Sequence, residues 1–506
     1  MANLYTSLGL ARRDPGAPFA RRAGRPVTTY GELHDSAGRM AQALVSLGIA
    51  PGDRVAVQSE KCLEMLVLYL ATVRAGAVFL PMNPAYTPVE AGHILADAAP
   101  ALLVCGAATA EALRQGAGVA LPRIETLEVD DSGSLIALAA GHSPDFATVD
   151  RADDDLAAIL YTSGTTGRPK GAMLSHDNLF ANAATLVDCW RFTADDVLVH
   201  ALPIFHTHGL FVGTNVTLAA GSSMIFHEKF DAGAVLAALD GASVLMGVPT
   251  FYIRLLGQAG LTRAAVRTMR LFVSGSAPLS ADVHRDFAAT TGHAILERYG
   301  MTETNMNTSN PYVGERRAGT VGVPLPGVSL RITGEDGTVL PPGQIGMIEV
   351  HGPNVFQGYW NLPEKTAQEF RAGRWFITGD LGMIDADGYA AIVGRGKDLI
   401  ISGGFNVYPA EIEDAIDALP EVRESAVIGV PHPDLGEGVV AVIAPSEPGW
   451  ADAAAVMAAL DGRLARFKQP RRVIFVPELP RNAMGKIQKA VLRERHAALF
   501  APVAPD

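Results

Sequence analysis

The chain has 506 residues and a formal net charge of −12, with 48% hydrophobic and 19% charged residues. This length is too great for one compact core, so two or more domains are expected. The acidic balance excludes a general attraction to nucleic acid or to an anionic membrane, so anionic substrates have to be met by local clusters of positive charge.

The cysteines Cys62, Cys105 and Cys189 are widely spaced and form no C-x-x-C pair. This predicts reduced, mostly buried thiols in a cytoplasmic protein without a cysteine metal site. The N-terminus lacks the basic start and long apolar core of a signal peptide. The most apolar stretch, residues 62–82, is interrupted by charged residues and glycine, so we expect a buried helix running into a strand rather than a membrane span.

Helix and strand signals alternate over the first 150 residues. Residues 29–47 have apolar residues at helical spacing, and Thr29 followed by Glu32 is typical of a helix start. A strand is predicted at 54–58. The alternation favours a layered α/β fold with parallel strands, and the acidic stretch 131–155 is expected to be a surface connection.

The run YTSGTTGRPKG, residues 161–171, combines hydroxyls, glycines and one lysine after the strand-like sequence LAAILYT. A helix-start signal follows at Ser175, so the run is predicted to be a loop between a strand and a helix. Backbone N–H groups and hydroxyls of such a loop can surround a polyphosphate. It is not a Walker loop, because its lysine follows a proline. The residues expected to surround the phosphates are Thr162, Ser163, Gly164, Thr165, Thr166, Gly167 and Lys170. The alternative is a flexible Gly/Thr-rich surface loop.

A strand at 197–201 leads into LPIFHTHG, which ends at Gly209. Two histidines beside a glycine at a strand end indicate either a pocket wall or a packed turn. A His-x-His metal site is disfavoured because no third ligand cluster follows.

Two further strand ends carry small or polar residues. Residues 270–278 read RLFVSGSAP, and small residues at the carboxyl end of a strand leave room for a flat ligand. Ser280 then begins a helix that carries Arg285. Residues 297–304 read ERYGMTET, which offers an aromatic ring for adenine, a hydroxyl for phosphate and a carboxylate for Mg²⁺.

The last third of the chain contains several charged turns. WFITGD, ending at Asp380, places at a strand end a carboxylate that can accept hydrogen bonds from ribose hydroxyls. The run 394–398, GRGKD, lies between two short apolar strands and has the composition of a hinge. The region 463–495 has ten Lys or Arg residues and two Glu, and within it Lys486 follows a glycine on a predicted turn.

These segments, in this order, resemble the acyl-adenylate-forming enzymes: acyl-CoA synthetases, adenylation domains of peptide synthetases and firefly-type luciferases. The resemblance covers nearly the whole chain. It implies an α/β fold with a large multi-subdomain N-terminal domain of layered sheets, residues 1–394. A small mobile α+β C-terminal domain, residues 395–506, is implied to carry the catalytic lysine.

The resemblance also implies roles for individual residues. Thr302 is assigned to the α-phosphate, Glu303 to Mg²⁺, Lys486 to adenylation and Lys397 to the hinge. Beside the phosphate loop, the implied nucleotide site comprises Gly275, Ser276, Ala277, Glu297, Arg298, Tyr299, Gly300, Met301, Asp380 (ribose) and Arg395. A glycine-rich loop at Ser402, Gly403 and Gly404 is assigned to the pantetheine channel of CoA.

The segments around the histidines, Arg285 and the YGMTE motif resemble malonyl-CoA synthetases. This implies ligation of malonate, and methylmalonate, to CoA through an acyl-adenylate, with release of AMP and pyrophosphate. By this resemblance His206 is a catalytic gate beside the acyl site, Arg285 clamps the distal carboxylate, and Thr207 and Met306 border the α-carbon. Ser276 completes the implied acyl site.

Three alternatives stay open at this point. The chain could ligate another short-chain acid to CoA, load a carrier-protein thiol, or act as a nucleotide sensor without catalysis. The sensor is disfavoured because Glu303, Asp380, Arg395 and Lys486 are all present. Because acetylation removes the charge of a lysine, Lys486 is also predicted to be a target of a lysine acetyltransferase and deacetylase.

Overall fold

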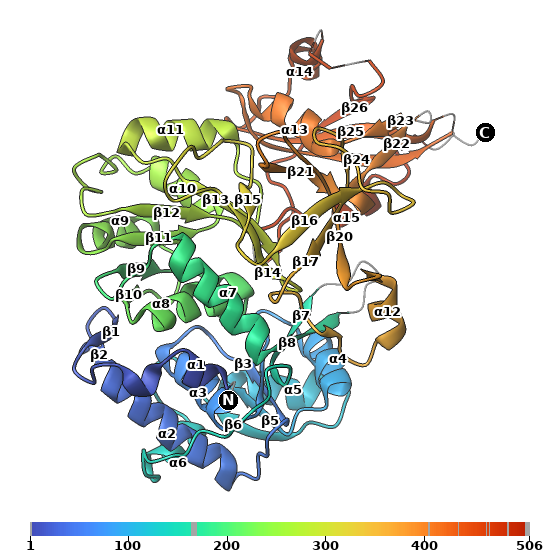
Figure 1. Cartoon of the computed structure of the whole chain (residues 1–506). Coiled ribbons are helices and arrows are strands. Elements are labelled where there is room, and N and C mark those ends of the chain that lie inside the picture. Colours follow the sequence, from blue (N-terminus) through green and yellow to red (C-terminus); the bar gives the residue numbers. More distant parts are fainter. Residues whose placement is uncertain are drawn as a thin grey trace. The chain divides into compact units, whose positions relative to one another are not determined.

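The computed structural model (Figure 1) describes residues 3–162, 169–402, 405–433, 435–461, 463–464, 466–482 and 485–500. The chain forms two compact units, residues 1–330 with 350–376, and residues 331–349 with 377–506. This division falls at 376/377. The domain boundary predicted between residues 394 and 395 is a different quantity, because it marks the expected hinge of a domain rotation. It stays a prediction.

The first unit contains a nine-stranded sheet with the order β15-β14-β13-β12-β11-β9-β10-β1-β2. Strands β1, β10, β9, β11, β12 and β13 run parallel to one another, whereas β2, β14 and β15 pair antiparallel. The bounds are β1 Pro18–Arg21, β2 Thr28–Thr29, β9 Val197–His200, β10 Ser223–Phe226, β11 Val244–Gly247, β12 Leu271–Ser274, β13 Leu296–Met301, β14 Asn305–Ser309 and β15 Val323–Pro324.

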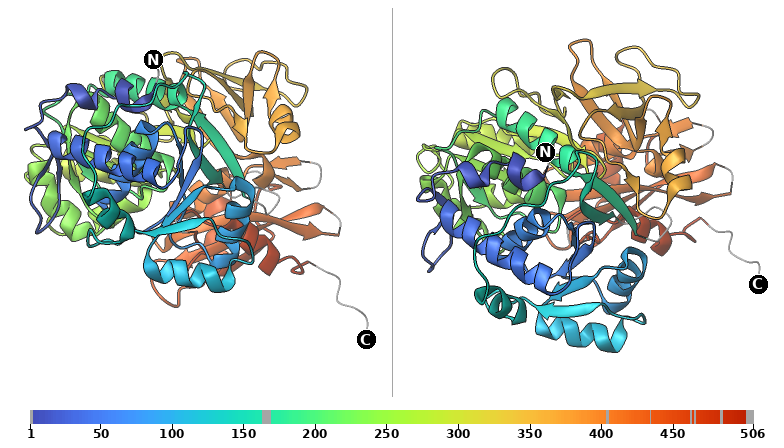
Figure 2. Two further views of the ribbon diagram at one scale, coloured as in Figure 1. Left: turned by 90° about the horizontal axis from the view of Figure 1, so that it is seen from below. Right: turned by 60° about the horizontal axis from the view of Figure 1, so that its bottom comes forward.

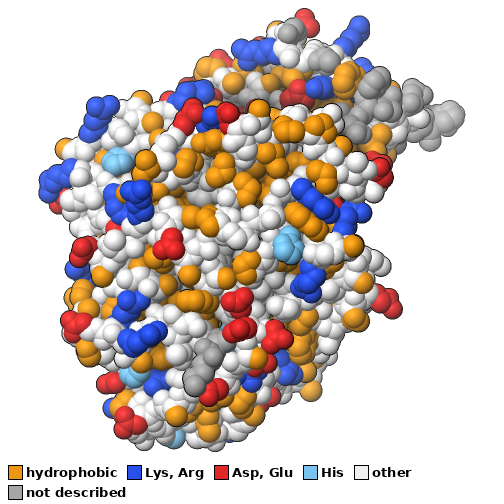
Figure 3. Space-filling view, in the orientation of Figure 1, with side chains coloured by type: hydrophobic (Ala, Val, Ile, Leu, Met, Phe, Trp, Pro, Cys, Tyr) orange, Lys and Arg blue, Asp and Glu red, His pale blue; other side chains and the backbone are white. Residues whose placement is uncertain are grey.

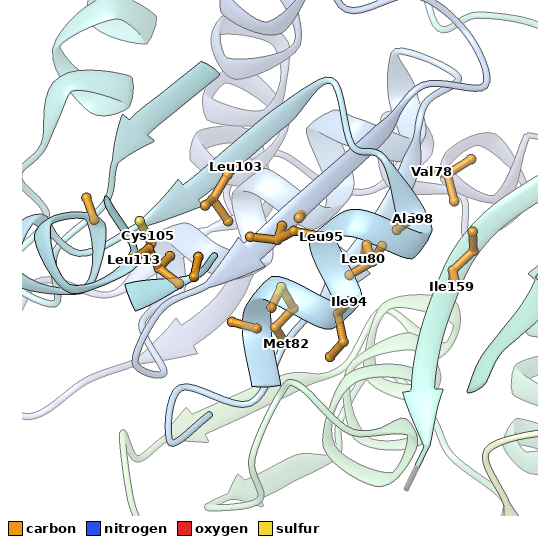
Figure 4. Close-up of a cluster of buried hydrophobic side chains, with 14 residues drawn as sticks. Val78, Leu80, Met82, Ile94, Leu95, Ala98, Leu103, Cys105, Leu113 and Ile159 are labelled. Carbon is orange, nitrogen blue, oxygen red and sulfur yellow. The ribbon is translucent and has the colours of Figure 1, made fainter. Parts of the chain in front are cut away.

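A seven-stranded sheet in the order β18-β8-β7-β4-β3-β5-β6 also belongs to this unit. Its strands are β3 Arg54–Gln58, β4 Val78–Pro81, β5 Leu102–Cys105, β6 Arg123–Thr126, β7 Leu156–Thr162, β8 Lys170–Ser175 and β18 Gly358–Tyr359. Helix α4 (Pro88–Ala98) packs on it through Ile94 and Leu95, which meet Leu80 and Leu103 of the strands in one buried cluster (Figure 4). Burial of these apolar side chains stabilises this layer of the fold.

The predicted helix starts are confirmed by their caps. Thr29 caps α2 (Tyr30–Ser46) and Ser175 caps α7 (His176–Cys189), each in a reciprocal capping box. Ser280 caps α11 (Ala281–Thr291). Helix α1 (Leu4–Ser7) lies beside α7, near the N-terminus marked in both views of Figure 2. The Leu4 amide donates to His176 Nδ1 of α7 at 3.0 Å.

The remaining helices of the first unit follow the strands in chain order. They are η1 Leu10–Arg12, α3 Leu63–Arg74, α5 Ala107–Gly116, α6 Ser134–Ala140, η2 His208–Thr214, α8 Asn215–Ala220, α9 Ala232–Ala238, η3 Leu239–Gly241, α10 Pro249–Leu256 and α12 Pro363–Gln368. Of the stretch 131–155 expected to be a surface connection, residues 134–140 form a helix. Leu135 and Ala139 of that helix are buried.

The second unit contains a five-stranded sheet in which β23-β22-β25-β24 are neighbours and β26 pairs with β25. Its elements are β22 Ile400–Ser402, β23 Phe405–Val407, α13 Pro409–Asp417, β24 Val422–His432, β25 Gly436–Pro445, α14 Ala453–Leu460, β26 Arg472–Phe475 and α15 Lys489–Arg495. Two hydrophobic clusters cover the two faces of β24 and β25, one with α13 and α14 and one with α15.

A further five-stranded sheet has the order β16-β17-β20-β19, with β21 paired to β20. Its bounds are β16 Ser329–Thr333, β17 Gly346–His351, β19 Phe370–Arg371, β20 Trp375–Ile384 and β21 Ala390–Arg395, after which η4 spans Gly396–Asp398. The division between the two units passes through β16, β17 and β20.

Two details differ from the sequence analysis. The phosphate loop was predicted to lead from a strand to a helix, but β8 (Lys170–Ser175) lies between them and pairs antiparallel with β7. Asp380 was predicted at a strand end, but β20 continues to Ile384 because the following residues pair with β21. The predicted α/β fold, with a large N-terminal part and a small C-terminal domain, is confirmed.

The surface in Figure 3 has acidic and basic side chains interspersed over the face shown. No large area of one sign is visible on that face. Among the described helices, none combines the length and apolar character that a membrane span requires.

Candidate active site

The carboxyl ends of the parallel strands β9, β11, β12 and β13 meet at one edge of the nine-stranded sheet, where α/β proteins bind ligands. Ser276, just past β12, has φ +73. Its Oγ lies 3.2 Å from Nδ1 of His208, which follows β9. Backbone strain of this kind at a non-glycine residue is typical of functional sites.

His208 and Thr207 are buried side chains with unused hydrogen-bonding atoms. His208 is 3% and Thr207 7% exposed, and neither His208 Nε2 nor Thr207 Oγ1 has a hydrogen-bond partner among the described residues. Burial, with the nearby Arg298, lowers the pKa of His208 well below its usual value. His208 is therefore a neutral imidazole that offers an unused nitrogen to a ligand.

Arg298 of β13 is the most deeply buried cation at this edge. It is 2% exposed, and its Nε and Nη2 atoms have no hydrogen-bond partner among the described residues. A Cβ added to Gly275 would lie 2.5 Å from the Arg298 guanidinium, so a side chain there would displace the guanidinium. Burial lowers the pKa of Arg298 to about 9, so the guanidinium is charged at neutral pH. A buried charge of this kind is stabilised by a bound anion.

Glu297, next to Arg298, was predicted to bind the nucleotide but has a local structural contact as well. Its Oε1 accepts the Leu279 amide at 3.3 Å, and its Oε2 has no partner among the described residues. Burial raises the pKa of Glu297 to about 8. The side chain is therefore mainly protonated at neutral pH and can donate a hydrogen bond.

Glu303, the predicted Mg²⁺ ligand, lies in the turn after β13 and is 5% exposed. Tyr359 of β18 donates its hydroxyl to Glu303 Oε1 at 2.9 Å. The same ring lies under the ammonium of Lys170, 4.2 Å from Nζ to the ring centroid, and Lys170 forms an ion pair of 3.7 Å with Glu369. Tyr359 thus links the predicted metal carboxylate to the predicted phosphate lysine.

This link was missed by the sequence analysis. Tyr359 and Glu369 belong to the segment GYWNLPEKTAQEF, which carries none of the recognised motifs. The pairing of β18 with β8 places Tyr359 opposite Ala172, on the strand that begins with Lys170. The only signal in the sequence is a pair of aromatic residues after a glycine.

The remaining segment of β13 and β14 is tightly packed. Tyr299, Gly300 and Met301 end β13, and Thr302 is half-buried in the turn. A Cβ on Gly300 would lie 1.8 Å from the Asn305 carbonyl oxygen and 2.7 Å from Met306 Cε. Met306 is 2% exposed, and its thioether packs closely against Gly300.

Three predicted acyl or adenine residues lie nearer the surface. His206 and Ala277 are half-buried. Arg285 is on the second turn of α11, where its side chain is 65% exposed and forms an ion pair with Asp282. Nothing in these contacts assigns Arg285 to the acid, and its role stays a prediction.

The phosphate loop can be followed only at its two ends. Thr162 pairs with Lys170 across β7 and β8. Ser163, Gly164, Thr165, Thr166 and Gly167 lie outside the described residues, as do Gly403 and Gly404 of the predicted CoA-side loop. Ser402 is buried at the end of β22.

In the second unit, Asp380 and Arg395 face each other across β20 and β21 and form an ion pair of 2.7 Å. Asp380 is 3% exposed. Lys397 is exposed on the single turn η4 directly after Arg395. The two residues predicted to touch the nucleotide are thus already held together by strand pairing.

Lys486 lies on a tight turn of the second unit. Its amide donates to Asn482 Oδ1 at 3.0 Å and its carbonyl accepts the Asn482 amide at 2.9 Å, while Arg481 pairs with Ile487. The side chain is exposed. The prediction of a lysine on an exposed turn is confirmed.

Polar residues at the carboxyl ends of parallel strands, with a buried arginine among them, are typical of an enzyme that binds small anionic ligands. Residues 10–360 match the family model of AMP-binding enzymes, and residues 411–486 match the AMP-binding enzyme C-terminal domain. The chain belongs to the AMP-binding enzyme family, as the sequence analysis predicted.

Similar proteins narrow this class. The crystal structure of ATP-bound MatB from Rhodopseudomonas palustris has a TM-score of 0.96 and 59% identity, covering 99% of each chain. A feruloyl-CoA synthase of an Amycolatopsis species is 38% identical over 96% of this chain and 97% of its own. The malonate–CoA ligase of Arabidopsis thaliana is 32% identical over 92% and 84%, respectively. Within its family the chain is an AMP-forming acid–CoA ligase.

The residues present fit the predicted Mg²⁺. Among the described residues no group of three or more His, Cys, Asp or Glu side chains could hold a metal. Mg²⁺ in nucleotide enzymes is bound by one or two carboxylates together with substrate phosphates. Glu303, a single buried carboxylate oriented by Tyr359, meets that requirement.

Proposed function

We propose that the chain ligates malonate to coenzyme A, with methylmalonate as a second substrate, in a reaction that consumes ATP and requires Mg²⁺. A carboxylate is a poor acylating agent because its leaving group would be an oxide. Attack of one malonate carboxylate oxygen on the α-phosphorus of ATP forms malonyl-adenylate and releases pyrophosphate. The CoA thiolate then attacks the carbonyl carbon, and AMP leaves.

The observation that carries this proposal is the buried guanidinium of Arg298 beside neutral His208, with Nε and Nη2 that have no hydrogen-bond partner among the described residues. A buried charge without a partner is strongly destabilising, so an anion is expected to complete the site. Malonate and ATP, the two reactants of the first step, are both anions, and either could pair with Arg298 at this edge of the sheet. Neutral His208 and Thr207 can bind and orient a carboxylate without protonating it, which leaves its oxygen nucleophilic.

Charge on the transferring phosphorus is neutralised by Lys170 and Lys486. Glu303 would hold Mg²⁺, which supplies further positive charge at the phosphates. Thr302 is assigned to the α-phosphate, and Asp380 with Arg395 to the ribose. The preformed Asp380–Arg395 pair supports this assignment, because it fixes the carboxylate before the nucleotide binds.

Malonate is favoured over a monocarboxylic acid by the similarity to a malonate–CoA ligase and by the arginines near the site. Arg285 is proposed to clamp the distal carboxylate in bidentate fashion. Its ion pair with Asp282 on the same helix face is exposed and therefore weak, so the guanidinium can exchange Asp282 for a substrate carboxylate.

The two half-reactions are proposed to use different parts of the C-terminal domain, with rotation at Lys397 exchanging Lys486 for the loop at Ser402, Gly403 and Gly404. Exposure of Lys397 and Lys486 supports this proposal. Lys397→Pro is expected to slow thioester formation while sparing adenylation. Exposure also makes Lys486 accessible to an acetyltransferase, which would remove its charge.

The function is tested by incubating the enzyme with ATP, Mg²⁺, CoA and one acid from a panel of acetate, malonate, methylmalonate, butyrate and octanoate. Release of AMP and formation of acyl-CoA are measured. The highest kcat/KM is expected for malonate. A higher value for octanoate or acetate would overturn the malonate assignment, and adenylate formation without acyl-CoA would point to a carrier-protein thiol instead.

A further inference from the structure

A buried lysine, Lys61, contacts the segment that precedes the histidines of the site. It is 7% exposed, and its Nζ donates to the His200 carbonyl oxygen at 2.8 Å and lies 3.0 Å from His200 Nδ1. The Nζ also lies 4.3 Å from the ring centroid of Phe226. Burial lowers the pKa of Lys61 well below its usual value, against a smaller opposite effect of Glu228.

The contacts of His200 fix the position of its proton. Nε2 lies 2.9 Å from the Gly209 carbonyl oxygen, which can only accept, so Nε2 has to carry the hydrogen. Burial, followed by Lys61, lowers the pKa of His200 to about 3, and its imidazole is neutral. Nδ1 is therefore an acceptor, and Lys61 donates to it.

Gly209 belongs to η2, a π-helical turn that the sequence analysis did not predict. Its carbonyl oxygen also accepts from Thr214 Oγ1 at 3.1 Å. A Cβ on Gly209 would lie 2.1 Å from the Pro203 carbonyl oxygen, and one on Gly213 would lie 3.0 Å from His200 Nε2. Such π-helical turns are rare and frequently occur at functional sites. His200, which lies outside this turn, contacts it through the Gly209 carbonyl oxygen.

Thr207 and His208 lie directly at the start of that turn. Their unused atoms, Thr207 Oγ1 and His208 Nε2, have no partner among the described residues that could hold them in place. Their position is set by the backbone of the turn and by the contact of Ser276 with His208 Nδ1. Any shift of Gly209 therefore moves both ligand-facing atoms.

We propose that Lys61 is a positioning residue for the acid site, acting through His200 on the π-helical turn that places Thr207 and His208. Without the amine, His200 Nδ1 loses its donor and the imidazole is free to exchange tautomers or rotate. His200 Nε2 is then no longer held as the donor to the Gly209 carbonyl oxygen. This inference rests on the proposed role of the strand edge in binding the acid, and it does not depend on which acid is bound.

The test measures KM for the acid and for ATP in Lys61→Met, His200→Leu, His200→Gln and the double variant Lys61→Met/His200→Leu. The acid is whichever member of the panel the wild-type enzyme turns over best, so that a wrong malonate assignment does not affect the outcome. Lys61→Met keeps the length of the side chain and removes its donors. Loss of such a bond is expected to raise KM for the acid by about threefold to tenfold, with KM for ATP unchanged.

Two comparisons separate positioning from general destabilisation. The double variant is expected to have the same KM for the acid as His200→Leu, because of these two side chains only the imidazole of His200 contacts the Gly209 carbonyl oxygen. The bond from Lys61 to the backbone carbonyl of residue 200, which His200→Leu keeps, does not reach the turn by itself. His200→Gln, which keeps one donor and one acceptor, is expected to stay near the wild-type value. Tyr5→Phe, which removes a partly buried bond of 2.8 Å to His34 Nδ1 elsewhere in the unit, is the matched control and should change neither KM.

Additive effects in the double variant, or equal increases in KM for the acid and for ATP, would overturn the proposal. An unchanged KM for the acid in both Lys61→Met and His200→Leu would overturn it as well. If Lys61→Met does not fold, the comparison of His200→Gln with His200→Leu decides, and equal KM values for the acid in these two variants contradict the proposal.

Discussion

Two groups of residues assigned to the site, one in each unit, differ in their exposure to solvent. At the strand edge of the first unit, Thr207, His208 and Arg298 are buried, and each has at least one side-chain atom without a hydrogen-bond partner among the described residues. In the second unit Lys397 and Lys486 are exposed on short turns. Under the proposed function, the part of the acid site formed by Thr207, His208 and Arg298 is built into a packed core, although Arg285 is exposed. The lysine proposed to change place between the half-reactions lies where motion costs little packing.

Lys486→Ala tests the exposed side of this comparison and has the largest expected effect. In the proposed function its charge offsets the negative charge that develops at the α-phosphate, and loss of such a group costs on the order of 10² to 10³ in rate. Adenylate formation, measured by pyrophosphate exchange, should fall by that factor. Thioester formation from supplied malonyl-adenylate should be unchanged, and an equal loss in both steps would show that Lys486 is not specific to the first.

Arg285→Ala tests whether an exposed arginine contributes to acid recognition. Loss of a charge-assisted pair to the distal carboxylate should lower kcat/KM for malonate by about tenfold to a hundredfold, while butyrate is unaffected. Arg267→Ala is the matched control, because Arg267 is similarly exposed and pairs with Asp240 at 2.8 Å. Equal losses for malonate and butyrate would mean that the arginine is structural.

Tyr359→Phe tests the buried link between Glu303 and Lys170. It removes the hydroxyl that donates to Glu303 but keeps the ring under the Lys170 ammonium. We expect about a tenfold lower rate of pyrophosphate exchange and a higher requirement for Mg²⁺. Tyr30→Phe, which loses a buried bond of 2.7 Å to the Ser222 carbonyl oxygen, should show neither change. An unaltered Mg²⁺ dependence in Tyr359→Phe would separate Tyr359 from the metal site.

The buried histidines predict how stability depends on pH. Burial lowers the pKa of His200 to about 3 and that of His176 to about 4, from 6.5. Their contribution to stability is therefore present above pH 6.5 and is lost as the pH falls toward 4, because the unfolded state takes up the protons first. Each histidine should contribute about 1.4 kcal/mol of destabilisation per pH unit in that window.

Urea unfolding at pH 6.5 and pH 5 measures this loss. His176→Gln, which keeps an acceptor for the Leu4 amide, should have a shallower pH dependence than the wild type. A slope that is the same in the variant would contradict the assignment of His176 as a neutral buried imidazole.

Much of the fold followed from local sequence signals. The caps at Thr29, Ser175 and Ser280 and the strand LAAILYT lie where the patterns predicted them. The strand β8 was missed because its six residues follow the glycine-rich loop without a turn signal of their own. The π-helical turn at 208–214 was missed because it is held by His200 and by tight packing, and not by a helical repeat.

The contacts of the site could not be predicted in the same way. Tyr359 and Glu303 are 56 residues apart, and Lys61 and His200 are 139 residues apart. Such pairs arise from strand pairing and burial, which no local pattern encodes. The motif around Arg298 indicated a nucleotide site. That Nε and Nη2 of Arg298 have no hydrogen-bond partner in the described part of the chain became visible only from the structure.

The acyl-adenylate intermediate is tested most directly by following a carboxylate oxygen through the reaction. The enzyme is given malonate labelled with ¹⁸O in both carboxylates, together with ATP, Mg²⁺ and CoA, and the AMP is analysed by mass spectrometry. If the carboxylate attacks the α-phosphorus, one ¹⁸O atom is transferred to each AMP formed. Unlabelled AMP, or ADP with label in inorganic phosphate, would contradict an acyl-adenylate intermediate.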